Sequence, residues 1–336
     1  MTRKRVVIVG GGLSGLLAAA ALEGLGFKTQ VLEPGKLGGE FTSGGLKYIH
    51  RTRAMVSLME ELEVPHSDYK VRGGILLSGQ VEPYPAALRK MPKERAEEIR
   101  GDHYMKTRKH APDSFGEKSM NDPTSGRGSR RALRCDIEDL INALVARTKV
   151  RSTRLLAVES ERNRIVVQDT HDPDELGPKY LPYDYLVLTL PLWVTRQISD
   201  FYVPESRAML LNILTVRPEG DPYVKWDYVY TPYTPADAVH RISPVDGLYS
   251  VEVNGSWEEK SRDALRDLAW LFPDGYYLED VKAGLKGHLL PLGQKINWPA
   301  NVVGVGRFAA WDPRSTADVA LELALKMGRK WSESDA

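Results

Sequence analysis

The sequence predicts an α/β fold in which a parallel sheet is assembled from separated segments and an α+β domain is inserted between them. Three observations predict it: apolar runs flank an alanine-rich apolar segment at the start of the chain, a buried-strand pattern occurs at 183–191, and an α/β pattern returns from residue 302. With 336 residues, of which 42% are hydrophobic, the chain is long enough for about two domains.

The first forty residues are expected to form a strand, a helix and a second strand. Val6 to Val9 is a four-residue apolar run, Leu13 to Leu25 is apolar with many alanines, and Thr29 to Leu32 is apolar again. Because a helical crossover brings its two flanking strands together in parallel, these segments predict a βαβ unit.

The rest of the chain supplies further elements. Asp136 is placed to cap a helix that runs through Arg147. The basic region that follows a helix at 53–62 is rich in Pro and Gly and is expected to be irregular. The other expected elements are short strands near 155–158 and 165–167, a strand buried on both faces at 183–191, a strand at 302–306 and a helix from about 316 to 327.

A glycine motif marks the turn between the first strand and the first helix. Residues 10–15, Gly10-Gly11-Gly12-Leu13-Ser14-Gly15, fit the pattern G-x-G-x-x-G, and Glu33 ends the second strand 18 residues later. Gly10 suits a tight turn, Gly12 lets the backbone approach a pyrophosphate, and Gly15 lets helix and strand pack closely. The helix N-terminus attracts phosphates, and Glu33 is suited to accept hydrogen bonds from ribose hydroxyls. The motif predicts a Rossmann-like dinucleotide-binding domain.

The next segment resembles a motif of flavoenzymes. Glu33-Pro34-Gly35-Lys36-Leu37-Gly38-Gly39-Glu40-Phe41 is similar to the second glycine motif of the amine-oxidase superfamily, with Glu40 at the position of the usual arginine. The strand ending at Thr189-Leu190-Pro191 resembles the interior strand of that family, and Leu155 falls about where the family contacts adenine through its backbone. This resemblance implies FAD as the cofactor.

Two more stretches resemble UDP-galactopyranose mutase, within the same superfamily. Gly45 to Thr52 is similar to the Gly-x-His-x-x-His-Thr motif of the mutase, with Lys47 in place of its first histidine, and Asn301 to Phe308 is similar to the closing Gly-Arg segment. A helix that begins near Thr316 and points at the flavin would stabilise the charge of its reduced form. The cofactor-binding candidates are Gly10, Gly12, Leu13, Ser14, Gly15, Glu33, Pro34, Gly38, Gly39, Glu40, Leu155, Gly306, Arg307 and Thr316.

Four residues are candidates for the substrate side of the flavin: Lys47, His50, Arg241 and Tyr230. Lys47 is suited to hold a water at flavin N5 or to act as a base, and His50 is suited to donate a hydrogen bond. Arg241 offers a planar fork for carboxylate or phosphate, and the stretch that holds it and Tyr230 resembles a diphosphate-binding segment of the mutase. The alternatives are an exposed strand lysine, a structural histidine and a surface ion pair.

The expected architecture has two domains. A Rossmann-like FAD-binding domain is built from the discontinuous segments 1–60, 130–200 and 290–336. An α+β substrate domain, with a possible role in binding DNA, comprises 61–129 and 201–289.

One segment of the chain is strongly basic. The net charge is +1, yet residues 86–135 contain thirteen Lys/Arg and seven Asp/Glu. Such a segment suits phosphates, so double-stranded DNA is the expected partner, and a solvated surface insertion is the alternative. The expected DNA contacts are Arg89, Lys90, Lys106, Arg108, Lys109, Arg127, Arg130 and Arg131.

Two activities from different classes fit these features. The whole sequence resembles flavoproteins of bacteriophage thymidine hypermodification. That resemblance implies oxidation and cleavage of the C–N bond of a glycine-type amino acid on a modified thymine in DNA, which leaves an aminomethyl base after base flipping. The first alternative is a mutase-type sugar-nucleotide isomerase, and the second is a DNA- or partner-binding protein in which FAD is structural.

Other chemistries are set aside on residue types and spacing. Cys135 is the single cysteine, which excludes an internal disulfide, and no His/Cys/Asp cluster has metal-ligand spacing. The sequence has no Gly-x-Ser-x-Gly elbow and no phosphate-loop lysine. The absence of a signal-peptide pattern and of an apolar run of ~20 residues leads us to expect a cytoplasmic location, in the host if the protein is phage-encoded.

Overall fold

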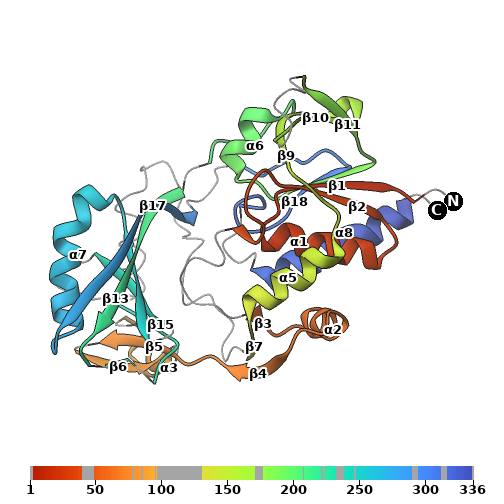
Figure 1. Ribbon diagram of the computed structural model, residues 1–336. Coiled ribbons are helices and arrows are strands. Elements are labelled where there is room, and N and C mark those ends of the chain that lie inside the picture. Colours follow the sequence, from red (N-terminus) through yellow and green to blue (C-terminus); the bar gives the residue numbers. More distant parts are fainter. Residues whose placement is uncertain are drawn as a thin grey trace.

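The computed structural model describes residues 3–39, 49–77, 79–84, 86–94, 96, 131–170, 177–206, 208–220, 222–223, 225–231, 238–245, 247–289, 294–311 and 316–334. Its elements form two groups, one around a parallel sheet and one around a larger mixed sheet (Figure 1). The expected α/β fold class is confirmed.

The parallel sheet is assembled from distant parts of the chain. Its strand order is β18 (Val302–Gly304), β12 (Tyr185–Leu188), β1 (Arg5–Val9), β2 (Lys28–Leu32) and β8 (Val150–Arg151). Strand β1 pairs in parallel with β2 and β12, and helix α1 (Leu13–Gly24) makes the crossover from β1 to β2. The predicted βαβ unit is therefore confirmed.

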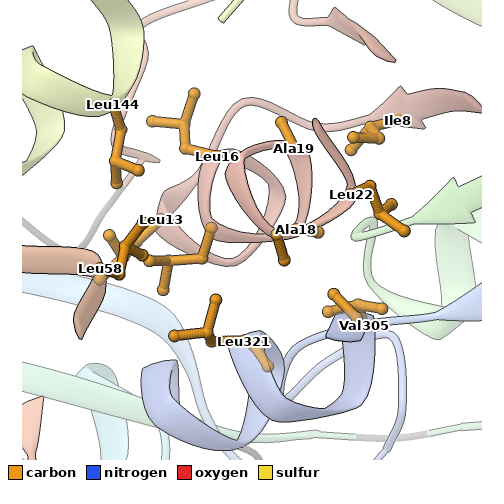
Figure 2. Close-up of a cluster of buried hydrophobic side chains, with 14 of the residues drawn as sticks. Ile8, Leu13, Leu16, Ala18, Ala19, Leu22, Leu58, Leu144, Val305 and Leu321 are labelled. Atoms are coloured by element: carbon orange, nitrogen blue, oxygen red, sulfur yellow. The ribbon is translucent and has the colours of Figure 1, made fainter. Parts of the chain in front are cut away.

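Helices cover one face of this sheet. Val6 and Ile8 of β1 point into a buried cluster that the helices complete. Figure 2 shows α1 at the centre of this cluster, with Leu58, Leu144 and Leu321 around it from three other helices. Because α1 is enclosed on several sides, it is apolar over most of its circumference. The three other helices are α2 (Arg53–Glu61), α5 (Ile137–Arg147) and α8 (Ala317–Ser334).

A small antiparallel sheet covers the opposite face. Val7 and Val9 of β1 point into a second cluster with Val158 and Ile165, as the alternation of side chains along a strand requires. The expected strands near 155–158 and 165–167 belong to this sheet. Its order is β11 (Lys179–Pro182), β10 (Arg164–Asp169) and β9 (Thr153–Glu159), and helix α6 (Leu192–Ile198) follows β12.

Side-chain caps fix the starts of two helices. The Asp136 carboxylate accepts a hydrogen bond from the Glu138 N–H at 2.8 Å, which confirms the predicted cap of α5. Thr52 caps α2 by accepting from the Met55 N–H at 3.2 Å. The last helix extends to Ser334, beyond the expected end near 327.

The mixed sheet has one face covered by helix α7 (Trp257–Leu271). Leu268 and Leu271 of α7 pack against Val229 and Ile242 of the sheet. In Figure 1, α7 lies on the side of the sheet that faces away from the parallel sheet. The strand order is β17 (Tyr276–Leu289), β13 (Ala208–Pro218), β16 (Leu248–Asn254), β15 (Val239–Val245), β14 (Tyr228–Tyr230), β5 (Gly73–Leu77) and β6 (Gln80–Pro83).

The expectation that the basic region, residues 86–135, is irregular is wrong for both of its described ends. Ala86–Lys90 form helix α3, and Arg131–Cys135 form strand β7, which joins β3 (Ile49–His50) and β4 (His66–Lys70) in an antiparallel sheet. Gly73 and Gly74 lie inside β5, where side chains would overlap Tyr228 and Val81. These glycines serve close packing within a strand, so they do not mark a loop.

The two sheets follow the expected division of the chain. The strands of the parallel sheet all come from segments 1–60, 130–200 and 290–336, and those of the mixed sheet from 61–129 and 201–289. The domain boundaries themselves stay a prediction. Among the helices of the described residues, none has the length and apolar character needed to cross a membrane.

Candidate functional site

The glycine turn after β1 is held between the ends of two neighbouring strands. The Gly10 N–H donates to the Leu32 carbonyl O at 2.9 Å. Thr189, just after β12, donates its hydroxyl to the carbonyl O of Val9 at 2.9 Å. Gly10 has a φ of +105°, and a Cβ there would overlap the Thr189 hydroxyl. Both the backbone conformation and the lack of space therefore require glycine at position 10.

The N-terminus of α1 follows this turn directly. Gly12 is the N-cap residue and has no side chain with which to accept from the first-turn N–H groups. A Cβ at Gly12 would meet no heavy atom of the described residues within 4 Å, whereas a Cβ at Gly15 would lie 1.9 Å from the Gly10 carbonyl O. The turn is thus tightly packed at Gly15 and open at Gly12, where the positive end of the helix suits an anion.

Glu33 stands beside this turn at the end of β2. One oxygen of its carboxylate accepts from the Gly11 N–H at 2.7 Å, and the other accepts from the Gly35 N–H at 2.8 Å. Its own N–H donates to the Arg151 carbonyl O at 3.1 Å. A carboxylate oxygen has two lone pairs, so each oxygen keeps capacity for a further donor such as a ribose hydroxyl.

The second glycine pair lies directly against the first. The Gly38 N–H donates to the Gly11 carbonyl O at 2.9 Å, and Gly12 and Gly38 form a parallel bridge. Gly38 and Gly39 have φ values of +85° and +60°, and a Cβ on Gly39 would lie 3.5 Å from the Gly12 Cα. Positive φ explains the choice of glycine at both positions, and at Gly38 a Cβ would in addition lie 2.7 Å from the Ile141 side chain.

The closing segment reaches the same place from the far end of the chain. The Val305 N–H donates to the Leu188 carbonyl O at 2.9 Å, which places Gly306 just past β18. Gly306 has a φ of +92°, and a Cβ there would lie 2.6 Å from the Ser14 hydroxyl. Gly306 is therefore packed on the first turn of α1.

These contacts define a cradle made of residues 10–15, Glu33, Gly38, Gly39 and Gly306. The cradle combines an open helix N-terminus, a backbone without side chains at the point of approach, and a carboxylate with acceptor capacity. A dinucleotide requires these three features for its pyrophosphate and its ribose, so the residues present fit such a cofactor. The structure brings together most of the cofactor candidates predicted from the sequence.

The remaining cofactor candidates lie around the cradle or apart from it. Pro34 and Arg307 are exposed, and the Thr316 hydroxyl donates to the Asp318 carboxylate at 2.6 Å just before α8. Leu155, on β9, packs on the face of the parallel sheet opposite α1. Glu40 lies outside the described residues.

The catalytic candidates are divided between the sheets. His50 lies in β3 and pairs with Ala132, whereas Tyr230 and Arg241 are cross-strand neighbours in the mixed sheet. Lys47 lies outside the described residues. The structure therefore joins Tyr230 to Arg241 and places His50 on a separate sheet.

Arg241 forms an ion pair, but not on the surface. Its guanidinium pairs with the Glu252 carboxylate of β16, and the two side chains are 25% and 7% exposed. Sequence reasoning missed Glu252. The alternation of apolar and polar residues along Val251, Glu252 and Val253 was the available signal, because it places Glu252 on the face opposite α7.

The cations expected to contact DNA are only partly described. Arg89 and Lys90 end α3, and Arg131 is an exposed residue at the start of β7. The other five lie outside the described residues: Lys106, Arg108, Lys109, Arg127 and Arg130.

Thiol and metal chemistry find no support in the described part of the chain. Burial, with a smaller contribution from the nearby Asp136 carboxylate, raises the pKa of the Cys135 thiol to about 11, so the thiol stays protonated at neutral pH. No group of three or more His, Cys, Asp and Glu in the described residues is arranged to hold a metal ion.

Comparison with known proteins agrees with this geometry. Residues 8–57 match the family model of the NAD(P)-binding Rossmann-like domain. Sequence comparison with curated proteins finds no match.

Solved structures cover nearly the whole chain. Reduced UDP-galactopyranose mutase aligns with a TM-score of 0.67 at 13% identity over 97% of this chain and 94% of its own. An oxidoreductase from Methanosarcina mazei aligns with a TM-score of 0.67 at 14% identity over 96% and 100%. Cyclohexylamine oxidase from Brevibacterium oxydans aligns with a TM-score of 0.64 at 12% identity over 99% of both chains. At these identities the likeness shows the fold alone, and the chain shares its fold with UDP-galactopyranose mutase and cyclohexylamine oxidase.

Proposed function

We propose that this protein is an FAD-dependent oxidoreductase that oxidises the C–N bond of a glycine-type amino acid attached to a modified thymine in DNA. The observation that carries the flavin part is the convergence of three distant glycine segments on the N-terminus of α1, next to Glu33. A fold shared with amine oxidases supports the reaction class.

The residues of the cradle have separate roles in holding the cofactor. The N–H groups of Leu13 and Ser14, in the first turn of α1, would bind the pyrophosphate, Gly12 would admit it, and the Glu33 carboxylate would accept from the ribose hydroxyls. When bound, FAD supplies the two-electron oxidation of a carbon that bears nitrogen. The protein must hold that carbon against the flavin and admit one water for hydrolysis of the substrate imine.

The proposed reaction balances as follows. The glycine Cα loses a hydride to FAD, and its nitrogen loses a proton, which leaves an imine between them. Water adds to the imine carbon and the C–N bond breaks. The products are glyoxylate and an amino group that stays on the thymine methyl carbon, so that the base carries an aminomethyl group.

The DNA part of the proposal rests on charge and on the resemblance to phage flavoproteins. Arg89, Lys90 and Arg131 are cations suited to contact phosphates, and the sequence between α3 and β7 contains further basic residues. A target base within a duplex would have to be flipped out to reach the flavin. Such a DNA substrate places the reaction in the cytoplasm of an infected host.

Product analysis tests this proposal. Duplex DNA that carries glycine on its thymine methyl carbons is incubated with the FAD-loaded protein, digested to nucleosides and analysed by mass spectrometry. We expect aminomethyl-deoxyuridine and one glyoxylate for each base converted. Unchanged glycine-bearing nucleoside, with DNA bound and FAD present, would refute the assignment.

A mutase-type activity is the second candidate, since UDP-galactopyranose mutase aligns over 97% of this chain. That reaction needs reduced flavin and causes no net oxidation. Conversion of UDP-galactopyranose by the dithionite-reduced protein, without any conversion of glycine-bearing DNA, would select the mutase instead.

A further inference from the structure

The inner face of the mixed sheet carries a row of polar side chains. Val251 and Val253 of β16 pack toward α7, so the alternating Ser250, Glu252 and Asn254 lie on the opposite face. Ser243 of β15 lies directly across from Ser250 in the strand register. This face is turned away from α7 and toward the parallel sheet (Figure 1).

Three members of this row are buried and have no hydrogen-bond partner among the described residues. Ser243, Ser250 and Asn254 are 1%, 7% and 4% exposed. Their side-chain oxygens find no partner in the structure as described. Buried polar atoms are almost always hydrogen-bonded in native proteins, so a cluster of three exceptions on one sheet face indicates a place where a ligand supplies the partner.

The charges on this face favour a hydrogen-bond donor over an anion. Arg241 is paired with Glu252, so this cation is already balanced by a buried carboxylate. Among the unpartnered atoms the Asn254 amide oxygen only accepts hydrogen bonds, whereas the two serine hydroxyls both accept and donate. A diphosphate would bring negative charge and further acceptors against the Asn254 oxygen and the Glu252 carboxylate, whereas an amine brings N–H donors.

We propose that Ser243, Ser250 and Asn254, with Glu252, recognise the amine nitrogen of the substrate. This inference rests on the proposed function and adds the residues that set its specificity. A protonated secondary amine donates two hydrogen bonds. Alternate residues on β16 point to the same face, and their Cα atoms are about 7 Å apart, so one nitrogen can lie between two neighbouring side chains of the row.

A matched pair of ligands isolates the contact. The first ligand is the nucleoside with glycine on the thymine methyl carbon, and the second has an ether oxygen in place of its amine nitrogen. Binding of both is measured by calorimetry under anaerobic conditions to the FAD-loaded protein after reduction with dithionite, because the reduced protein binds the amine without oxidising it. The variants are Ser250→Ala and Ser243→Ala, and the matched control is Ser199→Ala, whose buried hydroxyl also lacks a partner but lies outside the mixed sheet.

We expect Ser250→Ala to weaken binding of the amine about tenfold and to leave binding of the ether unchanged, because only the amine donates to the lost hydroxyl. The ligand-free variants should keep or raise Tm, since an unpartnered buried hydroxyl destabilises the free protein. Unchanged amine affinity in both variants, or a fall in Tm below that of Ser199→Ala, would overturn the proposal. Tighter binding of UDP-galactose than of the amine would also overturn it.

The outcomes separate this inference from the proposed function. If wild-type protein binds the amine through Ser250 but never oxidises it, the recognition site stands and the activity fails. If the amine is oxidised with the same KM in wild type and Ser250→Ala, the activity stands and the recognition site fails.

Discussion

Replacing Gly15 with alanine tests whether the close packing of α1 on the glycine turn positions the cofactor. By helix propensity alone the change would stabilise α1 by about 1 kcal/mol. The structure predicts the opposite, because the new Cβ would lie 1.9 Å from the Gly10 carbonyl O, and ordinary contact begins at 3.4 Å. The helix and the turn must separate by about 1.5 Å to relieve this overlap, at a typical cost of about 1–3 kcal/mol for overpacking.

This displacement acts at the point where the first-turn N–H groups meet the pyrophosphate. A misplacement of about 1 Å typically costs about 100-fold in a positioned site, so we expect FAD affinity to fall by about that factor. The assay is FAD retained per chain after dialysis, together with titration of the apoprotein with FAD. Gly24→Ala is the matched control on the same helix, because Gly24 is exposed and its Cβ would meet no described atom within 4 Å. The control should gain about 0.5–1 kcal/mol and keep its FAD affinity. Equal FAD affinity in Gly15→Ala and wild type would refute the reasoning.

Three further predictions concern stability and reactivity. Burial raises the pKa of the Cys135 thiol to about 11. A thiol reagent at pH 8 should therefore react at least about tenfold more slowly with the native protein than with the protein unfolded in guanidinium. Equal rates in the two states would contradict the burial of this thiol. Asp267 of α7 is 1% exposed and accepts hydrogen bonds from two backbone N–H groups at the start of β15. Asp267→Ala should therefore lower the free energy of unfolding, measured in urea, by about 2–4 kcal/mol. Asp263→Ala on the same helix is the control and should lower it by about 0.5 kcal/mol or less. The hydrogen bond from Arg151 holds the pKa of the Asp169 carboxyl well below its usual range. The stability that Asp169 contributes is therefore present above the unfolded pKa near 4 and is lost as the pH falls through the folded pKa. The difference in Tm between wild type and Asp169→Asn should shrink with acidification, and a difference that stays constant would contradict this linkage.

The FAD-binding half of the fold was predictable because its signals are local. The apolar runs around residues 10–15 specify strand, turn and helix, and Gly15 is required by its contact with Gly10, only a few residues away in sequence. The final strand and helix carry the same kind of pattern. Local sequence even identifies Asp136 as a cap, since a helix cap acts on the next three residues.

The mixed sheet was less predictable because its signals are long-range. Gly73 and Gly74 make room for Tyr228, more than a hundred residues later in sequence, and for Val81 on the next strand. The pairing of Arg241 with Glu252 depends on the register between β15 and β16, which a single sequence does not reveal. The unpartnered serines follow from the same register.

The most direct test of the central claim is an anaerobic titration of the FAD-loaded protein with duplex DNA that carries glycine on its thymine methyl carbons. The account predicts that the visible absorbance of the oxidised flavin bleaches in a single turnover, with one glyoxylate formed per flavin reduced. Absorbance that stays unchanged while the same DNA is bound would contradict amine oxidation by this protein.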